Sequence, residues 1–235
     1  MDGPLARDAF DRLADGYDEQ GASKPANAYL ERPATLSLLP EVDGESVLDA
    51  GCGAGHLMQE LSERGGRVLG MDVSASMLAR ARQRVPTAQL FQADLASGLP
   101  LQDATVDGVV SSLAFHYIPE WRPLFAELHR VLRPSGWVVF SVQHPFADFL
   151  EYSGATNYHE RERVEADWDS FGEAVTVPAY RRPLGQMVGP ILDAGFTLEA
   201  LLEPTPTEAY RDADPERYAY ESTHPNFLCL RARRS

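Results

Sequence analysis

The chain of 235 residues contains few cysteines, a single lysine and no long apolar run. Cys52 and Cys229 are too few for a disulfide framework and stand at the wrong spacing for a zinc site, so we interpret both as free thiols. No run of about 18 apolar residues is present that would span a membrane. The N-terminus also lacks the basic and apolar regions of a secretory signal. These absences predict a soluble, cytoplasmic protein without a membrane partner.

Positive charge is scarce as well. Lys24 is the only lysine, and the formal net charge is −14. A field of this sign repels phosphate polymers, so nucleic acid is a disfavoured partner. The histidines and acids form no cluster at metal-ligand spacing, which predicts that no metal is bound. The sequence leaves the oligomeric state open.

The hydrophobic pattern alternates between strand-like and helix-like periods. Short apolar runs predict five strands, at 46–50, 67–72, 88–94, 106–112 and 137–142. Helical periods follow the first, second and fourth of these runs, and the clearest begins at Trp121. Strands that alternate with helices in this way predict an α/β fold, a doubly wound and mostly parallel sheet with helices on both faces. Such sheets bind ligands at the carboxyl ends of their strands.

The chain has 235 residues, of which 44% are hydrophobic, and this is enough to bury one sizeable core. We therefore expect a single domain over residues 1–235. The aromatic-rich, charged segment 144–182 is interpreted as an insertion that covers the strand ends. After it we expect one helix and two strands, at 196–203 and 226–233, joined by a long polar loop. The expected parts are N-terminal cap helices at 10–32, a ligand-binding core at 36–142, the insertion at 144–182, and the C-terminal helix and strand pair at 183–235.

The segment VLDAGCGAGH (47–56) places three glycines after the first predicted strand, in the pattern D-x-G-x-G-x-G. Glycine turns tightly and lets a ligand approach the backbone, and the following helix offers unpaired N–H groups. A dinucleotide site requires G-x-G-x-x-G, but His56 stands where the last glycine would be. The turn therefore indicates a nucleotide-like ligand of another kind, with a purely structural turn as the alternative.

Two acids end the next two predicted strands. Asp72 stands where a carboxylate can accept hydrogen bonds from both hydroxyls of a ribose, and Asp94 where it can accept from an adenine amine. Of these, Asp72 is the less ambiguous, because an acid that ends a buried strand carries a desolvation cost unless something donates to it.

Six segments in order resemble a known family. They are FDRLADGYDE, VLDAGCGAG, GMDVSASML, ADLASGLPL, VDGVVSSLAFHYI and ELHRVLRPSGWVVFSV. Together they cover about residues 10–142 and resemble the class I S-adenosylmethionine-dependent methyltransferases, of the small-molecule, methyltransferase type 11-like kind. The resemblance implies a Rossmann-like, seven-stranded sheet, mostly parallel, with an antiparallel last strand. It also implies S-adenosyl-L-methionine as the cofactor.

The resemblance implies a set of cofactor contacts at the strand ends. Gly51, Gly53 and Gly55 would pack against the methionine part and the ribose, and Asp72 would hold the ribose hydroxyls. The other implied contacts are Asp49 with the amine, Val73 and Met77 around the adenine, Asp94 and Leu95 at its edge, Ser111 and Ser112 along the methionine portion, and Tyr17 over the carboxylate. For Tyr17, Asp49 and Met77 a purely structural role stays open.

The sulfonium of this cofactor already activates the methyl group, so the protein must mainly hold an acceptor atom in line with it and exclude water. His116 and His144 are the candidate catalytic bases, with hydrogen bonding to the loop backbone as the alternative. The predicted acceptor is a small organic molecule, methylated on O, N or C. The insertion at 144–182 and the N-terminal residues 10–32 are expected to form its pocket. Its candidate binding residues are aromatic, although they are equally consistent with a small core of the insertion: Tyr117, Phe146, Phe149, Tyr152 and Trp168.

Two other functions remain open. One is methylation of a modified tRNA base, which the net charge opposes. The other is S-adenosylmethionine binding without catalysis. The fourth strand is followed by SSLAF rather than an N-P-P-Y-like tetrapeptide, which disfavours methylation of planar amines in nucleobases or protein amides.

Overall fold

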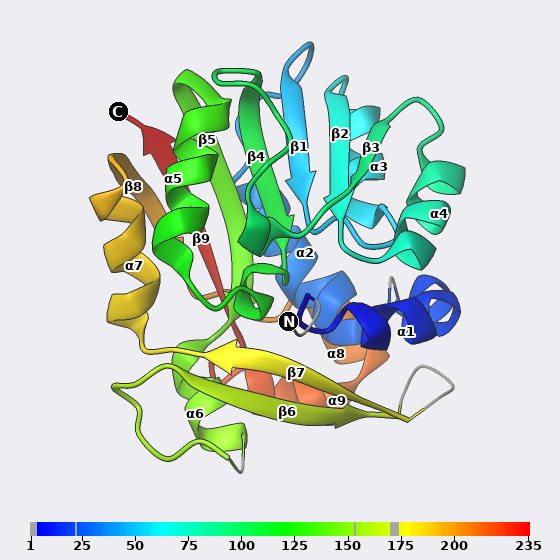
Figure 1. Ribbon diagram of the computed structural model, residues 1–235. Helices are drawn as coiled ribbons and strands as arrows, with labels where there is room; N and C mark the ends of the chain where they lie inside the picture. The colour runs from blue at the N-terminus through cyan, green and yellow to red at the C-terminus, as the bar shows by residue number, and fades with distance from the viewer. Residues whose placement is uncertain (1–3, 22, 153, 170–173) are drawn as a thin grey trace.

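The computed structural model describes residues 4–21, 23–152, 154–169 and 174–235 (Figure 1). Its central sheet has seven strands in the order β3-β2-β1-β4-β5-β9-β8. Neighbours from β3 to β5 are parallel, and β9 is antiparallel to both β5 and β8. The strands are β1 (Ser46–Ala50), β2 (Arg67–Asp72), β3 (Gln89–Gln92), β4 (Val106–Ser112), β5 (Leu132–Gln143), β8 (Phe196–Leu202) and β9 (Phe227–Arg234). The predicted α/β, Rossmann-like sheet with an antiparallel last strand is confirmed.

Helices cover both faces of this sheet (Figure 1). Successive side chains of a strand point to opposite faces, so β5 contributes to two cores. Val138 and Phe140 pack toward α5 and α7, whereas Trp137 and Val139 pack toward the face of α3 and α4. The helices of the sheet layers are α2 (Arg32–Ser37), α3 (His56–Glu63), α4 (Ala75–Arg84), α5 (Trp121–Val131) and α7 (Leu184–Asp193).

Three of the predicted strands, β1, β2 and β4, have the predicted bounds. By contrast, β5 is longer than the predicted 137–142, because the chain passes from α5 directly into extended backbone at Leu132. Leu132 already pairs with Val106 of β4, and an irregularity separates this pair from the regular ladder that starts at Trp137. Ser135, with φ +63°, lies within that irregularity.

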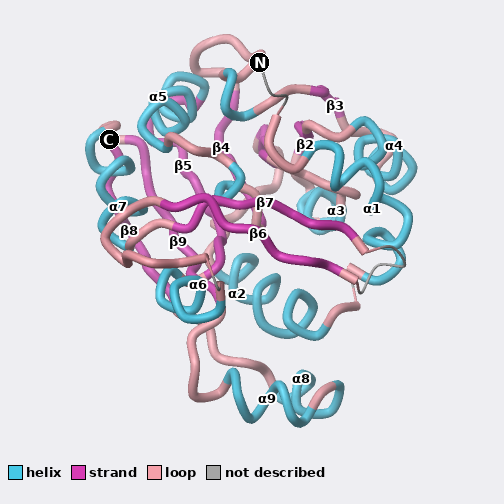
Figure 2. The backbone as a smooth tube through the Cα atoms, turned by 60° about the horizontal axis from the view of Figure 1, so that its bottom comes forward, coloured by secondary structure: helices cyan, strands magenta, loops and turns pink. Residues whose placement is uncertain are grey.

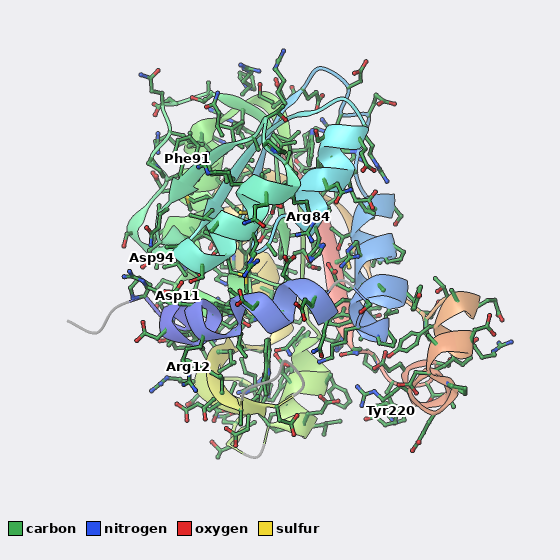
Figure 3. The ribbon with its side chains drawn as sticks, turned by 90° about the vertical axis from the view of Figure 1, so that its right-hand side faces the viewer. Asp11, Arg12, Arg84, Phe91, Asp94 and Tyr220 are labelled. Carbon is green, nitrogen blue, oxygen red and sulfur yellow. The ribbon has the colours of Figure 1, made fainter. Side chains whose placement is uncertain are left out.

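An N-terminal helix, α1 (Arg7–Gln20), lies across the start of α4 (Figure 3). Two polar ties hold it there. Asp11 accepts hydrogen bonds from the Ser74 hydroxyl at 2.6 Å and from the Ser76 N–H at 3.2 Å. Near the other end of the helix, Arg84 donates to Asp18 at 2.7 Å. The chain then reaches α2 through the π-helical turn η1 (Asn27–Glu31).

The segment predicted as an insertion contains α6 (Pro145–Glu151) and a separate antiparallel pair, β6 (Glu162–Trp168) and β7 (Val175–Arg181). Residues 153 and 170–173 of this segment lie outside the described residues. The hairpin runs across the carboxyl ends of the parallel strands, beside α1 (Figures 1 and 2). Its inner face is apolar, and Val175 and Val177 pack on residues of α1.

The long polar loop expected between 203 and 226 was predicted wrongly. It contains two short helices, α8 (Glu208–Ala213) and α9 (Pro215–Glu221), which project from the body of the molecule (Figure 2). Asp214 caps α9 by accepting from the N–H of Arg217 at 3.0 Å. Tyr210 of α8 is buried against Leu30 and Phe227. Neither helix is long enough to show a helical period in the sequence.

Two further turns of 3-10 helix, η2 (Leu95–Ser97) and η3 (Phe115–Tyr117), follow the ends of β3 and β4. No helix in the part of the chain that the structure describes is long and apolar enough to cross a membrane.

Candidate active site

The turn after β1 depends on glycines in the left-handed region of backbone conformation. Gly51 has φ +85°, and a Cβ on it would lie 2.3 Å from the Cβ of Ala114. Gly53 has φ +51° and faces open space. The N–H groups of Gly51 and Cys52 both donate to the carbonyl of Met71, at 2.8 and 3.0 Å, so the turn folds over the end of β2. The turn thus leaves bare backbone at Gly53 for a ligand to approach.

Gly55 has a different role from the other two glycines. It caps α3 with φ +84°, and a Cβ on it would lie 3.0 Å from the Cα of Ala81 in α4. Its missing side chain therefore lets α3 and α4 approach each other. Gly55 does not line either of the cavities described below.

Asp72 connects the glycine turn to the end of β2. Its Oδ2 accepts from the Gly53 N–H and its Oδ1 from the Ser74 N–H, each at 2.8 Å. Burial raises the pKa of this carboxyl, and the backbone donors at Ser74, Gly53 and Val73 counteract that shift. Each carboxylate oxygen can accept more than one hydrogen bond, so Asp72 can still accept from a ligand.

A cavity of about 700 Å³, which we call the main cavity, opens at these strand ends. One wall comes from the strand ends themselves. The opposite wall comes from the N-terminal segment, the loop after β4 and the β6–β7 hairpin. The predicted site residues that line it are Tyr17, Gly51, Gly53, Asp72, Val73, Met77, Asp94, Leu95, Ser112 and Tyr117. Lining residues that were not predicted individually include Leu5, Phe10, Ser97, Ile118, Arg163 and Tyr180. Of these, Phe10, Arg163 and Tyr180 lie in the two segments expected to form the acceptor pocket.

A smaller cavity of about 70 Å³, the side cavity, adjoins the main cavity and shares Tyr17, Gly51, Gly53, Ser112 and Leu113 with it. Asp49 lines it with 1% of its surface exposed, and its Oδ2 has no hydrogen-bond partner. Burial raises the pKa of Asp49 to about 8, and the charges of Asp72 and Glu31 add to the shift. An orphaned, buried carboxylate oxygen fits a cationic ligand group.

Glu31 also lines the side cavity, and no motif in the sequence pointed to it. It lies in η1 with 2% of its surface exposed. Its Oε1 accepts from the hydroxyls of Thr35 at 2.8 Å, Ser112 at 2.9 Å and Ser141 at 2.5 Å. This one carboxylate therefore ties the N-terminal segment to the ends of β4 and β5.

Asp94 lines the main cavity and caps η2. Its Oδ1 accepts from the Ala96 N–H at 2.9 Å, and the Ser97 hydroxyl lies 3.4 Å from its Oδ2. Figure 3 shows Asp94 on the side of the molecule where the sheet meets α1. The carboxylate thus shapes the loop as well as facing the cavity.

Neither candidate base lines the main cavity or the side cavity. His116 is buried, its Nδ1 has no partner, and burial together with the charge of Arg182 lowers its pKa to about 3. His144 has two partners: its Nδ1 accepts from the Phe146 N–H at 3.3 Å, and its Nε2 lies 2.8 Å from Glu203. His144 caps α6, which is the backbone role considered as the alternative.

Ser111 also lies away from both cavities. Its side chain is fully buried and donates to the carbonyl of Ala50 at 2.6 Å, which ties β4 to β1. Ser112, the next residue, points to the other face of the strand and reaches both cavities.

Of the five aromatic candidates for acceptor binding, the structure brings only Tyr117 to the main cavity. Phe146 is 50% exposed on α6, and Phe149 packs on Tyr158. Tyr152 donates to Gln143 at 3.2 Å, and Trp168 packs edge to face on Phe10. Of these contacts, only that of Phe149 with Tyr158 lies within the insertion, because Gln143 belongs to β5 and Phe10 to α1. The alternative interpretation, a small core of the insertion, is thus met by Phe149.

No group of three or more His, Cys, Asp or Glu residues suited to a metal ion occurs among the described residues. Both cysteines are free and buried. Burial raises the pKa of Cys52 well above its ordinary value and that of Cys229 to about 12, so both are protonated thiols at neutral pH.

Fold and site together define an α/β protein of the Rossmann-like class that binds a nucleoside-type ligand at the carboxyl ends of its strands. Comparison with known proteins gives the family. A family model described as a methyltransferase domain matches residues 48–140. An S-adenosylmethionine dependent methyltransferase from Mesorhizobium loti is 34% identical, with a TM-score of 0.77, and the match covers 87% of this chain and 97% of that one. The chain belongs to the S-adenosylmethionine-dependent methyltransferases, and its cofactor is S-adenosyl-L-methionine.

Two further proteins resemble the chain, one over most of its length and one over about half. A putative methyltransferase of the same kind from Listeria monocytogenes is 26% identical with a TM-score of 0.74, covering 87% of this chain and 96% of that one. A malonyl-[acyl-carrier protein] O-methyltransferase from Pectobacterium atrosepticum is 36% identical over 136 residues, which are 57% of this chain and 51% of the relative. The chain thus spans about half the length of that curated relative.

Proposed function

We propose that the protein transfers the methyl group of S-adenosylmethionine to an O, N or C atom of a small organic acceptor held in the main cavity. One observation carries the proposal: the two walls of the main cavity differ in chemistry. The strand-end wall presents glycine backbone and carboxylates, whereas Leu5, Phe10, Tyr117 and Ile118 make the opposite wall apolar and aromatic. Apolar walls with few polar groups are typical of small-molecule sites.

The residues at the strand ends fit the cofactor. Asp72 would accept from the ribose hydroxyls, Val73 and Met77 would flank the adenine, and Asp94 with Leu95 would hold its edge. The orphaned oxygen of Asp49 would face the cationic amino group in the side cavity. When bound, the cofactor supplies a methyl group that its sulfonium has already activated.

The same cavity lining limits the acceptor chemistry. No histidine lines the main cavity within the described ranges. Burial raises the pKa of Tyr117 well above its ordinary value, so its phenol stays protonated, can donate a hydrogen bond and cannot act as a base. The acceptor atom would therefore carry its own free lone pair at neutral pH, and the protein would position it and exclude water.

A carboxylate oxygen is the acceptor atom that best meets this requirement. The likeness to malonyl-[acyl-carrier protein] O-methyltransferases supports the same atom. Methylation of a carboxylate needs no base, because the nucleophile is already ionised at neutral pH.

The test is methyl transfer from S-adenosylmethionine labelled in its methyl group. The purified protein is incubated with a small-metabolite extract and, separately, with total RNA. We expect label in the small metabolites and none in RNA. Label in RNA alone would favour the tRNA methyltransferase, and cofactor binding without transfer to either would favour the non-catalytic protein.

A further inference from the structure

The β6–β7 hairpin places two polar side chains at the far end of the main cavity. Arg163 of β6 is paired with Tyr180 of β7 in the antiparallel register. Directly opposite residues of an antiparallel pair project from the same face of the hairpin. Both residues line the main cavity, so a guanidinium and a phenol lie side by side at its hairpin wall, on the face of the hairpin opposite to Val175 and Val177.

Charge is distributed unevenly around this cavity. Arg163 is the only cationic residue among the described lining residues, and the carboxylates of Asp72 and Asp94 lie at the opposite, strand-end wall. The carboxylate that is methylated would face the sulfonium of the bound cofactor, whereas a second anionic group of the acceptor would face these two carboxylates if it lay at the strand ends and the guanidinium if it lay at the hairpin. The unequal charges therefore give a bound anion one favourable orientation in the cavity.

The other three arginines of the insertion form hydrogen bonds or ion pairs within the protein. Arg161 donates to Glu120 and to the carbonyl of Pro119, and its guanidinium lies 5.6 Å from the centre of the Tyr180 ring. Arg181 is buried and paired with Glu162, and Arg182 is buried and donates to the carbonyl of Ile118. Arg161 thus supports the ring of Tyr180 beside Arg163.

Arg163 itself forms an ion pair that is open to solvent. It donates to Glu165 at 2.9 Å, and the two side chains are 56% and 53% exposed. An ion pair this open to water contributes little. A guanidinium carries five N–H donors in a planar fork that matches a carboxylate or phosphate, so Arg163 has donors available for a ligand.

We propose that Arg163, with Tyr180, binds an anionic group of the methyl acceptor, a carboxylate or a phosphate at the end of the molecule opposite the methylated atom. This inference rests on the proposed function and names its substrate class. The apolar side chains of Phe10 and Ile118, which also line the cavity, suit an apolar middle part of such an acceptor.

The experiment uses the full chain, S-adenosylmethionine labelled in its methyl group, and a small-metabolite extract separated beforehand by ion exchange into anionic, neutral and cationic fractions. We expect label in the anionic fraction, in a product that still binds the anion exchanger because its distal group is unchanged. Treating the anionic fraction with alkaline phosphatase beforehand distinguishes the two sources: loss of labelling identifies a phosphate, and retained labelling identifies a carboxylate.

Variants then test the residue. Arg163→Gln is expected to reduce kcat/KM for the labelled anion on the order of tenfold to a hundredfold, mainly through KM, because a charge-assisted contact made throughout the reaction is lost. Arg163→Lys should retain part of the activity, and Tyr180→Phe should lose less than Arg163→Gln. Glu165→Gln, which keeps the guanidinium and removes its partner, should leave KM unchanged or lower. Cofactor affinity by calorimetry should be equal in all four, which separates this role from a structural one.

Two results would overturn the proposal. If the wild type labels neutral or cationic molecules and Arg163→Gln matches it, Arg163 has no part in acceptor binding, although the methyltransferase function stands. If the wild type labels no small-molecule fraction at all, the proposed function fails, and this inference fails with it.

Discussion

The Oδ2 atom of Asp72 accepts a hydrogen bond from the N–H of Gly53 at 2.8 Å, and this contact joins the end of the second strand to the turn after the first. One carboxylate therefore holds the glycine turn and faces the main cavity. A change at Asp72 should disturb the turn and the cofactor together, because the two depend on the same oxygens.

The first prediction concerns this residue. Asp72→Ala should weaken S-adenosylmethionine binding by about a hundredfold or more, because it would remove the two charge-assisted hydrogen bonds proposed to the ribose, each typically worth roughly 1.5–3 kcal/mol. Isothermal calorimetry measures the affinity, and thermal unfolding reports the loss of the turn contact separately. Asp193→Asn is a matched control, since Asp193 pairs with Arg122 and lines neither cavity. Unchanged affinity in Asp72→Ala would remove Asp72 from the cofactor site.

The second prediction concerns the pH dependence of cofactor binding. Because the pKa of Asp49 is raised to about 8, its carboxyl is largely protonated at pH 6 in the free protein. A cationic ligand group favours the ionised form, so binding should release a proton and tighten with rising pH, by up to about tenfold per unit between pH 6 and 7.5. The cofactor amine is still cationic over that range. His56, the histidine that lines the side cavity, stays neutral there because burial lowers its pKa to about 4.

Calorimetry in two buffers of different ionisation enthalpy measures the proton release directly. Asp49→Asn is the matched variant, and its affinity should be weaker and independent of pH over this range. A wild-type affinity that does not change between pH 6 and 7.5 contradicts the assignment of Asp49 to the cofactor amine.

The third prediction is that Asp49→Asn stabilises the cofactor-free protein near pH 8. The folded-state pKa of about 8 lies above the ordinary value of 3.8, so the folded protein holds a proton that the unfolded chain releases over this range. The stability of the wild type should therefore fall as the pH rises from 4 to 8, by at most about 1.4 kcal/mol for each unit from this group. Chemical denaturation of both proteins at pH 5 and pH 8 tests this, and the advantage of Asp49→Asn should be larger at pH 8.

The strands of the sheet could be predicted because a strand buried on both faces is a short, continuous apolar run, and here such a run is consistent with few other structures. The sequence also predicted the side chains fixed by a strand end, such as Asp72. It failed where a role depends on which way a side chain points. Ser111 and Ser112 are neighbours on one strand and face opposite sides, so only Ser112 reaches the cavity.

The residues that were not predicted individually come from segments whose positions depend on distant contacts. Arg163 and Tyr180 are 17 positions apart and meet only because the β6–β7 hairpin pairs them. Glu31 has two of its three partners on β4 and β5, far along the chain, and no motif near it in the sequence marks it. The aromatic residues of the insertion were equally consistent with a pocket and with a small core, and the four named as candidates do not line the main cavity.

The fourth prediction concerns the two candidate bases. His144→Ala should retain cofactor affinity and methyl transfer but unfold at a lower temperature, because it removes the cap of α6, a loss of roughly 0.5–2 kcal/mol. His144→Asn keeps an acceptor at the cap and should recover part of that stability. His116→Ala should also retain cofactor affinity. The pH profile of kcat decides the question: a profile that loses an ionisation in either alanine variant would make that histidine the base after all.

The fifth prediction concerns Glu31, whose Oε1 accepts from three hydroxyls. Glu31→Ala would leave the buried hydroxyl of Ser141 without this acceptor and release η1 from the strand ends. Each buried polar group left unsatisfied costs roughly 1–3 kcal/mol, so the melting temperature should fall clearly and cofactor binding should weaken. Glu31→Gln keeps one acceptor oxygen and should be milder in both respects. Glu41→Gln, at an exposed acid of the following segment, is the control. If Glu31→Ala melts and binds like the control, the three hydrogen bonds hold neither the N-terminal segment nor the side cavity in place.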